Sequence, residues 1–244
     1  MRITRIFIAL SAAALAQAAA AGQSPEPFFP SRAGTVLEYL QTDASGEPLM
    51  FLTDSIAEFS GDFLKGTARV VSSTQYPGDS LTIKADEAVR FENGEVIYDY
   101  AETMEESLVD MVRQSLEMAG ADEADIAEAG EVLGEVKVKG ECRGIPAQLS
   151  VGMELPDYEV EVKVMFVTTK ASCKDRKVVG REEIVTPAGS FDCYVVEEKT
   201  SVKTFMTNVK NSQKTWYARG VGMVRQQVWD KKKLVSTTEL TAIR

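Results

Sequence analysis

Alternating apolar and polar positions dominate the chain and predict a mainly β protein. The clearest example is 158–166, where apolar residues alternate with charged ones, as in a strand with one buried face. Turn residues separate such segments, and Asn93-Gly94 is the strongest hairpin signal because both residues tolerate positive φ. Lys174-Asp175-Arg176 is interpreted as another turn. The predicted strands are 35–42, 49–59, 64–75, 81–91, 95–100, 158–166, 177–185, 191–200, 202–209, 214–218, 223–229 and 234–243.

The spacing of apolar residues becomes helical after Asp99. Asp99 and Glu102 resemble a capping box, and apolar residues then recur every three or four positions up to Gly120. A second, alanine-rich and acidic helix is expected from Asp122 to about Leu133. These patterns predict a two-helix insert at about 101–134 between two β-rich halves.

The number of strands limits the architecture. A sheet of about ten or more antiparallel strands is too wide to stay flat, so we expect it to curl into an unclosed barrel. The two-helix insert would cover its concave face. Residues 34–244 are predicted to form this single domain, and the proline-rich residues 22–33 an extended lead-in.

The first 21 residues have the pattern of a secretory signal peptide. Arg2 and Arg5 precede a short apolar run, and the alanines 18–21 offer small-residue cleavage sites. No cysteine lies at the cleavage region, so a lipoprotein anchor is not indicated. No later stretch approaches the roughly 20 apolar residues of a transmembrane helix. We expect a soluble protein of the periplasm or the cell exterior, not a membrane-spanning one.

Charge and composition restrict the chemistry. Without Arg2 and Arg5, the 27 basic and 37 acidic residues leave a net charge of −12, which opposes nucleic acid and anionic lipid surfaces as partners. The chain has no histidine, which excludes Ser-His and Cys-His catalysis. We expect no metal, no cofactor and no enzymatic activity. Two buried carboxylates converging in a polar cleft would favour an enzyme instead.

One tetrapeptide, Gly78-Asp79-Ser80-Leu81, has the letters of the nucleophile block of GDSL esterases and lipases. Those enzymes need a histidine to take the serine proton. A β-turn explains the same residues.

Three cysteines remain to be placed. Cys193 alternates with apolar neighbours and is interpreted as a small buried residue of a strand. In an oxidising compartment, Cys142 and Cys173 are then the better candidates for a disulfide.

The methionines of the first predicted helix are the one sequence feature that suggests ligand binding. Met104, Met111 and Met118 repeat every seven residues along the first predicted helix, and flexible thioether side chains suit apolar ligands of variable shape. Ordinary packing of a helix on a sheet explains the same pattern. If a cavity lies beneath the helix, Met104, Leu108, Met111 and Val112 are its candidate lining. A ligand site there would need more than about 300 Å³ of open apolar space.

Four segments, 28–35, 146–157, 185–193 and 215–224, together resemble the TapB-like family of exported bacterial proteins, a domain of unknown function. The resemblance implies export and a β-rich fold without assigned chemistry. The order of strands, helices and strands is also similar to the lipoprotein-carrier class typified by LolA, which implies an unclosed barrel that holds acyl chains.

Two functions follow from these observations. The first is a non-catalytic envelope protein that binds a hydrophobic ligand or a lipidated partner in a cavity between sheet and helices. The alternative is a structural or protein-interaction module of the periplasm or cell surface with a packed interior. The partners we expect are an apolar small molecule, a lipid or an envelope protein.

Overall fold

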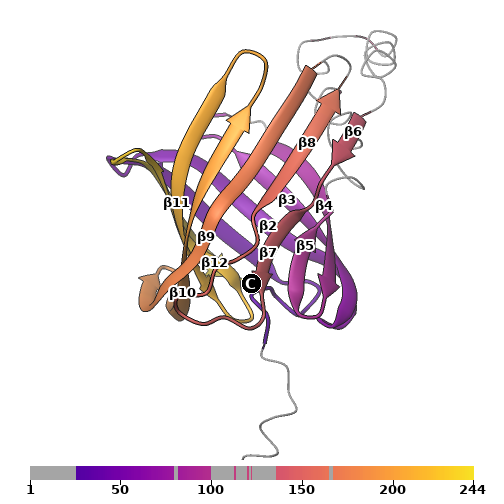
Figure 1. The fold of residues 1–244 in the computed structure, drawn as a ribbon, viewed down its shortest axis with the longest axis vertical. Coiled ribbons are helices and arrows are strands. Elements are labelled where there is room, and N and C mark those ends of the chain that lie inside the picture. The colour runs from indigo at the N-terminus through magenta and orange to yellow at the C-terminus, as the bar shows by residue number, and fades with distance from the viewer. Residues whose placement is uncertain are drawn as a thin grey trace, which may run out of the picture.

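The described part of the chain forms one antiparallel sheet. The computed structural model describes residues 26–79, 82–99, 136–164 and 167–244, together with Arg113, Gly120 and Asp122. Within these residues there are thirteen strands (Figure 1). They are β1 (Val36–Asp43), β2 (Pro48–Gly61), β3 (Lys65–Gln75), β4 (Thr82–Glu92), β5 (Glu95–Tyr98), β6 (Val136–Lys139), β7 (Cys142–Pro146), β8 (Tyr158–Val164), β9 (Val167–Thr186), β10 (Gly189–Lys203), β11 (Asn208–Ala218), β12 (Gly222–Asp230) and β13 (Lys233–Ile243). The prediction of a mainly β, antiparallel fold is confirmed.

The sheet is curled and not closed. Its strand order is β6-β8-β9-β10-β11-β12-β13-β1-β2-β3-β4-β5-β7, so β6 and β7 lie at its two ends. Figure 1 shows β2, β3 and β4 passing behind β8 and β9, so the sheet wraps around an interior. Because each strand is twisted relative to the next, thirteen of them cannot remain flat. The predicted curl is therefore present.

The turn predicted at Lys174-Asp175-Arg176 is wrong, because β9 runs through it as a strand of 20 residues. Asp175 has a positive φ of 54°, and the register between β9 and β10 shifts at this point. Turn residues therefore form a β-bulge here, which kinks a strand without ending it. The bulge is followed by Arg176, whose side chain is buried.

The predicted strand 202–209 is also wrong. It spans the tip of the β10–β11 hairpin, where Thr204 N–H donates to the Thr207 carbonyl at 2.9 Å. By contrast, the Asn93-Gly94 turn is confirmed, with φ values of 52° and 81° between β4 and β5.

Residues 22–33 are predicted to be an extended lead-in. Their described part, from residue 26, packs into the core. Phe28 and Phe29 are only 4% and 5% exposed. The Arg219 guanidinium lies over the Phe28 ring at 4.7 Å and donates to the Ala147 carbonyl at 2.8 Å. Phe29 contacts Phe91 with ring centroids 5.1 Å apart. These two side chains therefore close one end of the interior.

Two predicted segments lie outside the described residues. The signal peptide 1–21 is one, and the two-helix insert at about 101–134 is the other, apart from the three single positions Arg113, Gly120 and Asp122. In the described part of the chain, no helix is long and apolar enough to cross a membrane.

Candidate functional site

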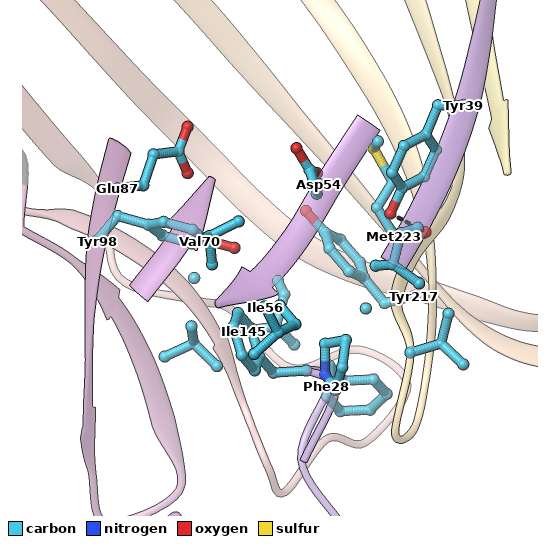
Figure 2. A pocket seen from close by; sticks show the side chains of 17 residues that line it. Phe28, Tyr39, Asp54, Ile56, Val70, Glu87, Tyr98, Ile145, Tyr217 and Met223 are labelled. Carbon is cyan, nitrogen blue, oxygen red and sulfur yellow. Dashed lines mark hydrogen bonds between the residues drawn. The ribbon is translucent and has the colours of Figure 1, made fainter. Parts of the chain in front are cut away.

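A pocket of about 210 Å³ lies inside the curled sheet. The N-terminal lead-in, the concave side of β1 to β5, β7, and residues at β11 and the start of β12 contribute to it (Figure 2). The lining residues are Phe28, Phe29, Pro30, Leu37, Tyr39, Asp54, Ile56, Val70, Glu87, Val96, Tyr98, Gly144, Ile145, Tyr217, Val221, Gly222 and Met223. In Figure 2 the side chains of Phe28, Ile56 and Ile145 lie together at one end of the pocket. That end is apolar.

Two carboxylates lie at the other side of the pocket, on β2 and β4, the two strands that flank β3. Asp54 of β2 and Ser72 of β3 are direct register partners, and Ser72 Oγ donates to Asp54 Oδ1 at 2.7 Å. Ser72 also interacts by a side-chain hydrogen bond with Glu87 of β4. One hydroxyl thus lies between two carboxylates. Figure 2 shows both carboxylates on the side of the pocket away from Phe28.

Burial changes the ionisation of this pair. It raises the pKa of Glu87 to about 7, and the negative charge of Asp54 contributes to the same shift. Burial also raises the pKa of Asp54. Burial and the charge of Asp54 therefore keep the Glu87 carboxyl protonated to a higher pH than an exposed glutamate.

Tyrosine side chains add hydroxyl groups to the polar side. Tyr39 is buried and donates to the Met223 carbonyl at 3.2 Å. Tyr217 points its hydroxyl toward Asp54 in Figure 2. Burial raises the pKa of both phenols, so they remain neutral hydrogen-bonding groups.

The combination of an apolar end and a polar, acidic side favours an amphipathic ligand. Carboxylates and hydroxyls would accept hydrogen bonds from an alcohol or ammonium head group. A free fatty acid would place its own carboxylate next to two others, which is unfavourable. Among the described residues, no group of three or more acidic or cysteine side chains is arranged to hold a metal ion.

A second polar cluster joins the two ends of the sheet. Arg176 of β9 pairs with Glu198 of β10, Nε to Oε2 at 3.2 Å, and both side chains are buried. Arg176 Nη2 also donates to the Gly144 carbonyl of β7 at 3.0 Å. Since β7 lies at one end of the strand order and β9 near the other, Arg176 holds the open seam of the sheet together.

Cys142 and Cys173 both lie beside Tyr158 at this seam. Both thiols interact with Tyr158, and Cys173 also with Glu198. Burial raises the pKa of the Cys173 thiol. The structure holds both cysteines as thiols, so the disulfide stays a prediction. Cys193 is fully buried, in agreement with its interpretation as a core residue.

The predicted ligand-binding residues Met104, Leu108, Met111 and Val112 lie outside the described residues. The pocket residues Asp54 and Glu87 were missed, although each has a signal in the sequence. Asp54 occupies the apolar register Leu52, Asp54, Ile56, and Glu87 precedes Val89 and Phe91 in the same way. A carboxylate in the buried register of a strand costs stability unless it is hydrogen-bonded, and thereby indicates a special role.

The comparisons with known proteins concern the fold. Residues 129–240 match the DUF3108-like family model. A candidate lipoprotein from Parabacteroides distasonis is similar at 21% identity and a TM-score of 0.66, over 91% of this chain and 100% of the other. A candidate exported protein with a YmcC-like fold from Bacteroides fragilis is similar at 18% identity and a TM-score of 0.65, over 90% and 99% of the two chains.

None of the curated proteins compared with the chain matches it. The matches above include neither the TapB-like family nor the LolA class, so both resemblances stay predictions. At these identities the solved structures support the fold alone. The chain is thus similar, across nearly its whole length, to proteins described as a candidate lipoprotein and a candidate exported protein.

Proposed function

We propose that this protein is a non-catalytic binding protein of the bacterial envelope that holds an amphipathic ligand inside its curled sheet. The pocket carries the proposal, because it combines an apolar end at Phe28 and Ile145 with a polar side at Asp54 and Glu87. A packed interior, as in a structural module, would have no such pocket. The descriptions of the similar proteins, a candidate lipoprotein and a candidate exported protein, support this location.

The size of the pocket limits the ligand. At about 30 Å³ for each water-sized group, 210 Å³ accommodates about seven such groups. This volume is below the roughly 300 Å³ at which typical small-molecule sites begin. A chain of about six carbons with one polar head would fill it. The end of a longer acyl chain, such as that of a lipidated partner of the LolA type, would enter only in part.

The test uses three probes with the same chain and different heads: hexylamine, hexanol and hexanoate. Calorimetric titration of the exported protein, purified and delipidated, should give saturable binding of hexylamine or hexanol with a Kd of about 1 mM or below, or about −4 kcal/mol. Hexanoate should bind more weakly at pH 8, where the carboxylate pair is charged. No saturable binding of any probe would exclude the proposal.

A matched pair of variants locates the site. Ile145→Phe adds volume at the apolar end of the pocket and should abolish binding. Val179→Phe adds the same aromatic group at an exposed position of β9 and should bind as the original protein does. Equal binding by both variants would place the ligand elsewhere.

The carboxylate pair favours a second candidate, general acid–base chemistry on a small bound molecule. Carboxyl groups with raised pKa values in a pocket are typical of such sites. Turnover of short-chain chromogenic esters or glycosides that disappears in Glu87→Gln would favour this second function. The binding proposal expects no turnover above buffer.

A further inference from the structure

The tip of the β10–β11 hairpin presents an apolar surface. Phe205 and Met206 are 80% and 77% exposed, and Val202 and Val209 beside them are exposed as well. The hairpin ends at the top of the view in Figure 1. An exposed phenylalanine next to an exposed methionine is unfavourable in water unless something covers them.

The tip has a defined conformation. Thr207 N–H donates to Thr204 Oγ1 at 3.0 Å, and the two threonine hydroxyls lie 3.0 Å apart. Together with the backbone bond between the same two residues, these contacts close a four-residue turn. Phe205 and Met206 occupy the two central positions of that turn. Their exposure is therefore built into the hairpin.

Lysines surround this tip in a chain that is otherwise acidic. The part of the hairpin nearest its tip and the paired first part of β9, residues 199–212 and 170–174, contain five lysines and no acidic residue. The registers Lys203 with Lys170 and Lys199 with Lys174 place these side chains on one face, opposite to that of the buried Cys173. Lys210 is paired with Ser201 on the same face.

The positive charge on this face is only partly neutralised. Lys170 pairs with Glu161 at 2.6 Å, and Lys199 pairs with Asp175 at 2.8 Å. Lys203 and Lys210 form no ion pair with another described residue. Lys203 directly precedes the turn, and Lys210 follows it by three residues.

A groove beside the tip is lined without any acidic side chain. Its volume is about 440 Å³. It is lined by four lysines and by hydroxyl and amide side chains: Lys174, Lys199, Lys210, Lys231, Ser172, Thr200, Ser201, Asn211 and Ser212. Ammonium and hydroxyl groups are donors suited to a phosphate oxygen.

We propose that the β10–β11 hairpin docks on a phosphate-bearing lipid surface, with Phe205 and Met206 inserted into the bilayer interface and the surrounding lysines on the head groups. The apolar residues lie at the tip of the hairpin, where they can reach the acyl chains. The lysines lie behind them, at the level of the phosphate head groups. The overall negative charge does not prevent this contact, since charges beyond about 8 Å are largely screened at physiological ionic strength.

The experiment is a flotation assay of the exported protein with vesicles of phosphatidylcholine alone or of phosphatidylglycerol and phosphatidylcholine in equal parts. We expect binding to the anionic vesicles at least tenfold stronger than to the neutral ones, because each lysine near an anionic surface contributes about fivefold, or about 1 kcal/mol. If the protein binds neither kind of vesicle, or binds both equally, the proposal is overturned.

Two double variants separate the contributions. Phe205→Ser/Met206→Ser should weaken binding at least tenfold through the loss of apolar insertion. Lys203→Gln/Lys210→Gln should weaken binding to anionic vesicles about twenty-fivefold and leave binding to neutral vesicles unaffected. All four positions are exposed, so both variants should keep the original thermal stability.

The matched controls change the same residue types elsewhere. Val185→Ser removes an apolar side chain that is 70% exposed at the opposite end of β9. Lys65→Gln/Lys84→Gln removes two exposed lysines of β3 and β4. Both controls should bind vesicles as the original protein does. If the tip variants also do so, or if the controls weaken binding equally, the hairpin is not the docking site.

Discussion

The buried ion pair between Arg176 and Glu198 lies where the two ends of the curled sheet meet. The side chains are 2% and 8% exposed, with Nε and Oε2 3.2 Å apart. The remaining nitrogens of Arg176 donate to the carbonyls of Pro156 and Gly144, each at 3.0 Å. One side chain therefore contacts β10, the β7–β8 connection and β7. The bulge at Asp175 is what directs it into the interior.

Breaking this pair should destabilise the fold. Arg176→Met leaves the Glu198 carboxylate buried without its partner, which we expect to lower the free energy of unfolding by about 3–5 kcal/mol. Denaturant unfolding followed by circular dichroism measures the change. The double variant Arg176→Met/Glu198→Leu should lose less free energy of unfolding than Arg176→Met alone. An equal or larger loss would show that the unpaired Glu198 charge does not cause the destabilisation.

Glu87 should make stability depend on pH. Its folded pKa of about 7 lies above its ordinary value of 4.5. The stabilising contribution is thus complete below about pH 4.5 and is lost as the pH rises through 7. Glu87→Gln should therefore match the original protein at pH 4 and exceed its stability at pH 8, by up to roughly 3 kcal/mol. Thermal melts at both pH values measure this. Glu47→Gln, at an exposed turn, should change neither melt.

Cys142 and Cys173 should form a disulfide after export. Their common neighbour Tyr158 brings both thiols to the seam. Mass spectrometry of peptides digested without reductant should recover the two cysteines in one linked species, and reduction should lower stability by about 3 kcal/mol. Alkylation of Cys142 in the folded, exported protein would show instead that it stays a thiol. Cys193→Ser should leave the linked species unchanged.

The Asn93-Gly94 turn offers a test of backbone geometry. Gly94 has a φ of 81°, and an added Cβ would lie 2.9 Å from the Ala147 Cβ. Gly94→Ala should therefore cost about 1–3 kcal/mol through strain at positive φ and the close contact. Gly46→Ala is the matched comparison, because it has a similar φ of 91° but no atom within 4 Å. An equal loss in both variants would assign the whole effect to φ.

Local patterns were sufficient for much of the sheet. Alternation located β1 to β5, β8, β12 and β13 to within a few residues, because one face of each strand is buried and the other is not. The same reasoning failed at Asp175 and at Phe205. Turn residues at Asp175 form a bulge within a strand, and apolar residues at Phe205 form an exposed tip. Neither outcome is visible in a window of ten residues.

The sequence by itself determined the class of the fold, its antiparallel hairpins, the absence of histidine chemistry and the average charge. Each of these depends on nearby residues or on composition. The tertiary structure alone decided that Asp54 and Glu87 share a pocket, that Arg176 bridges the two ends of the sheet, and that lysines gather around Phe205 although the whole chain is acidic. Such contacts join residues far apart along the chain, and they exist only once thirteen strands have curled around one interior.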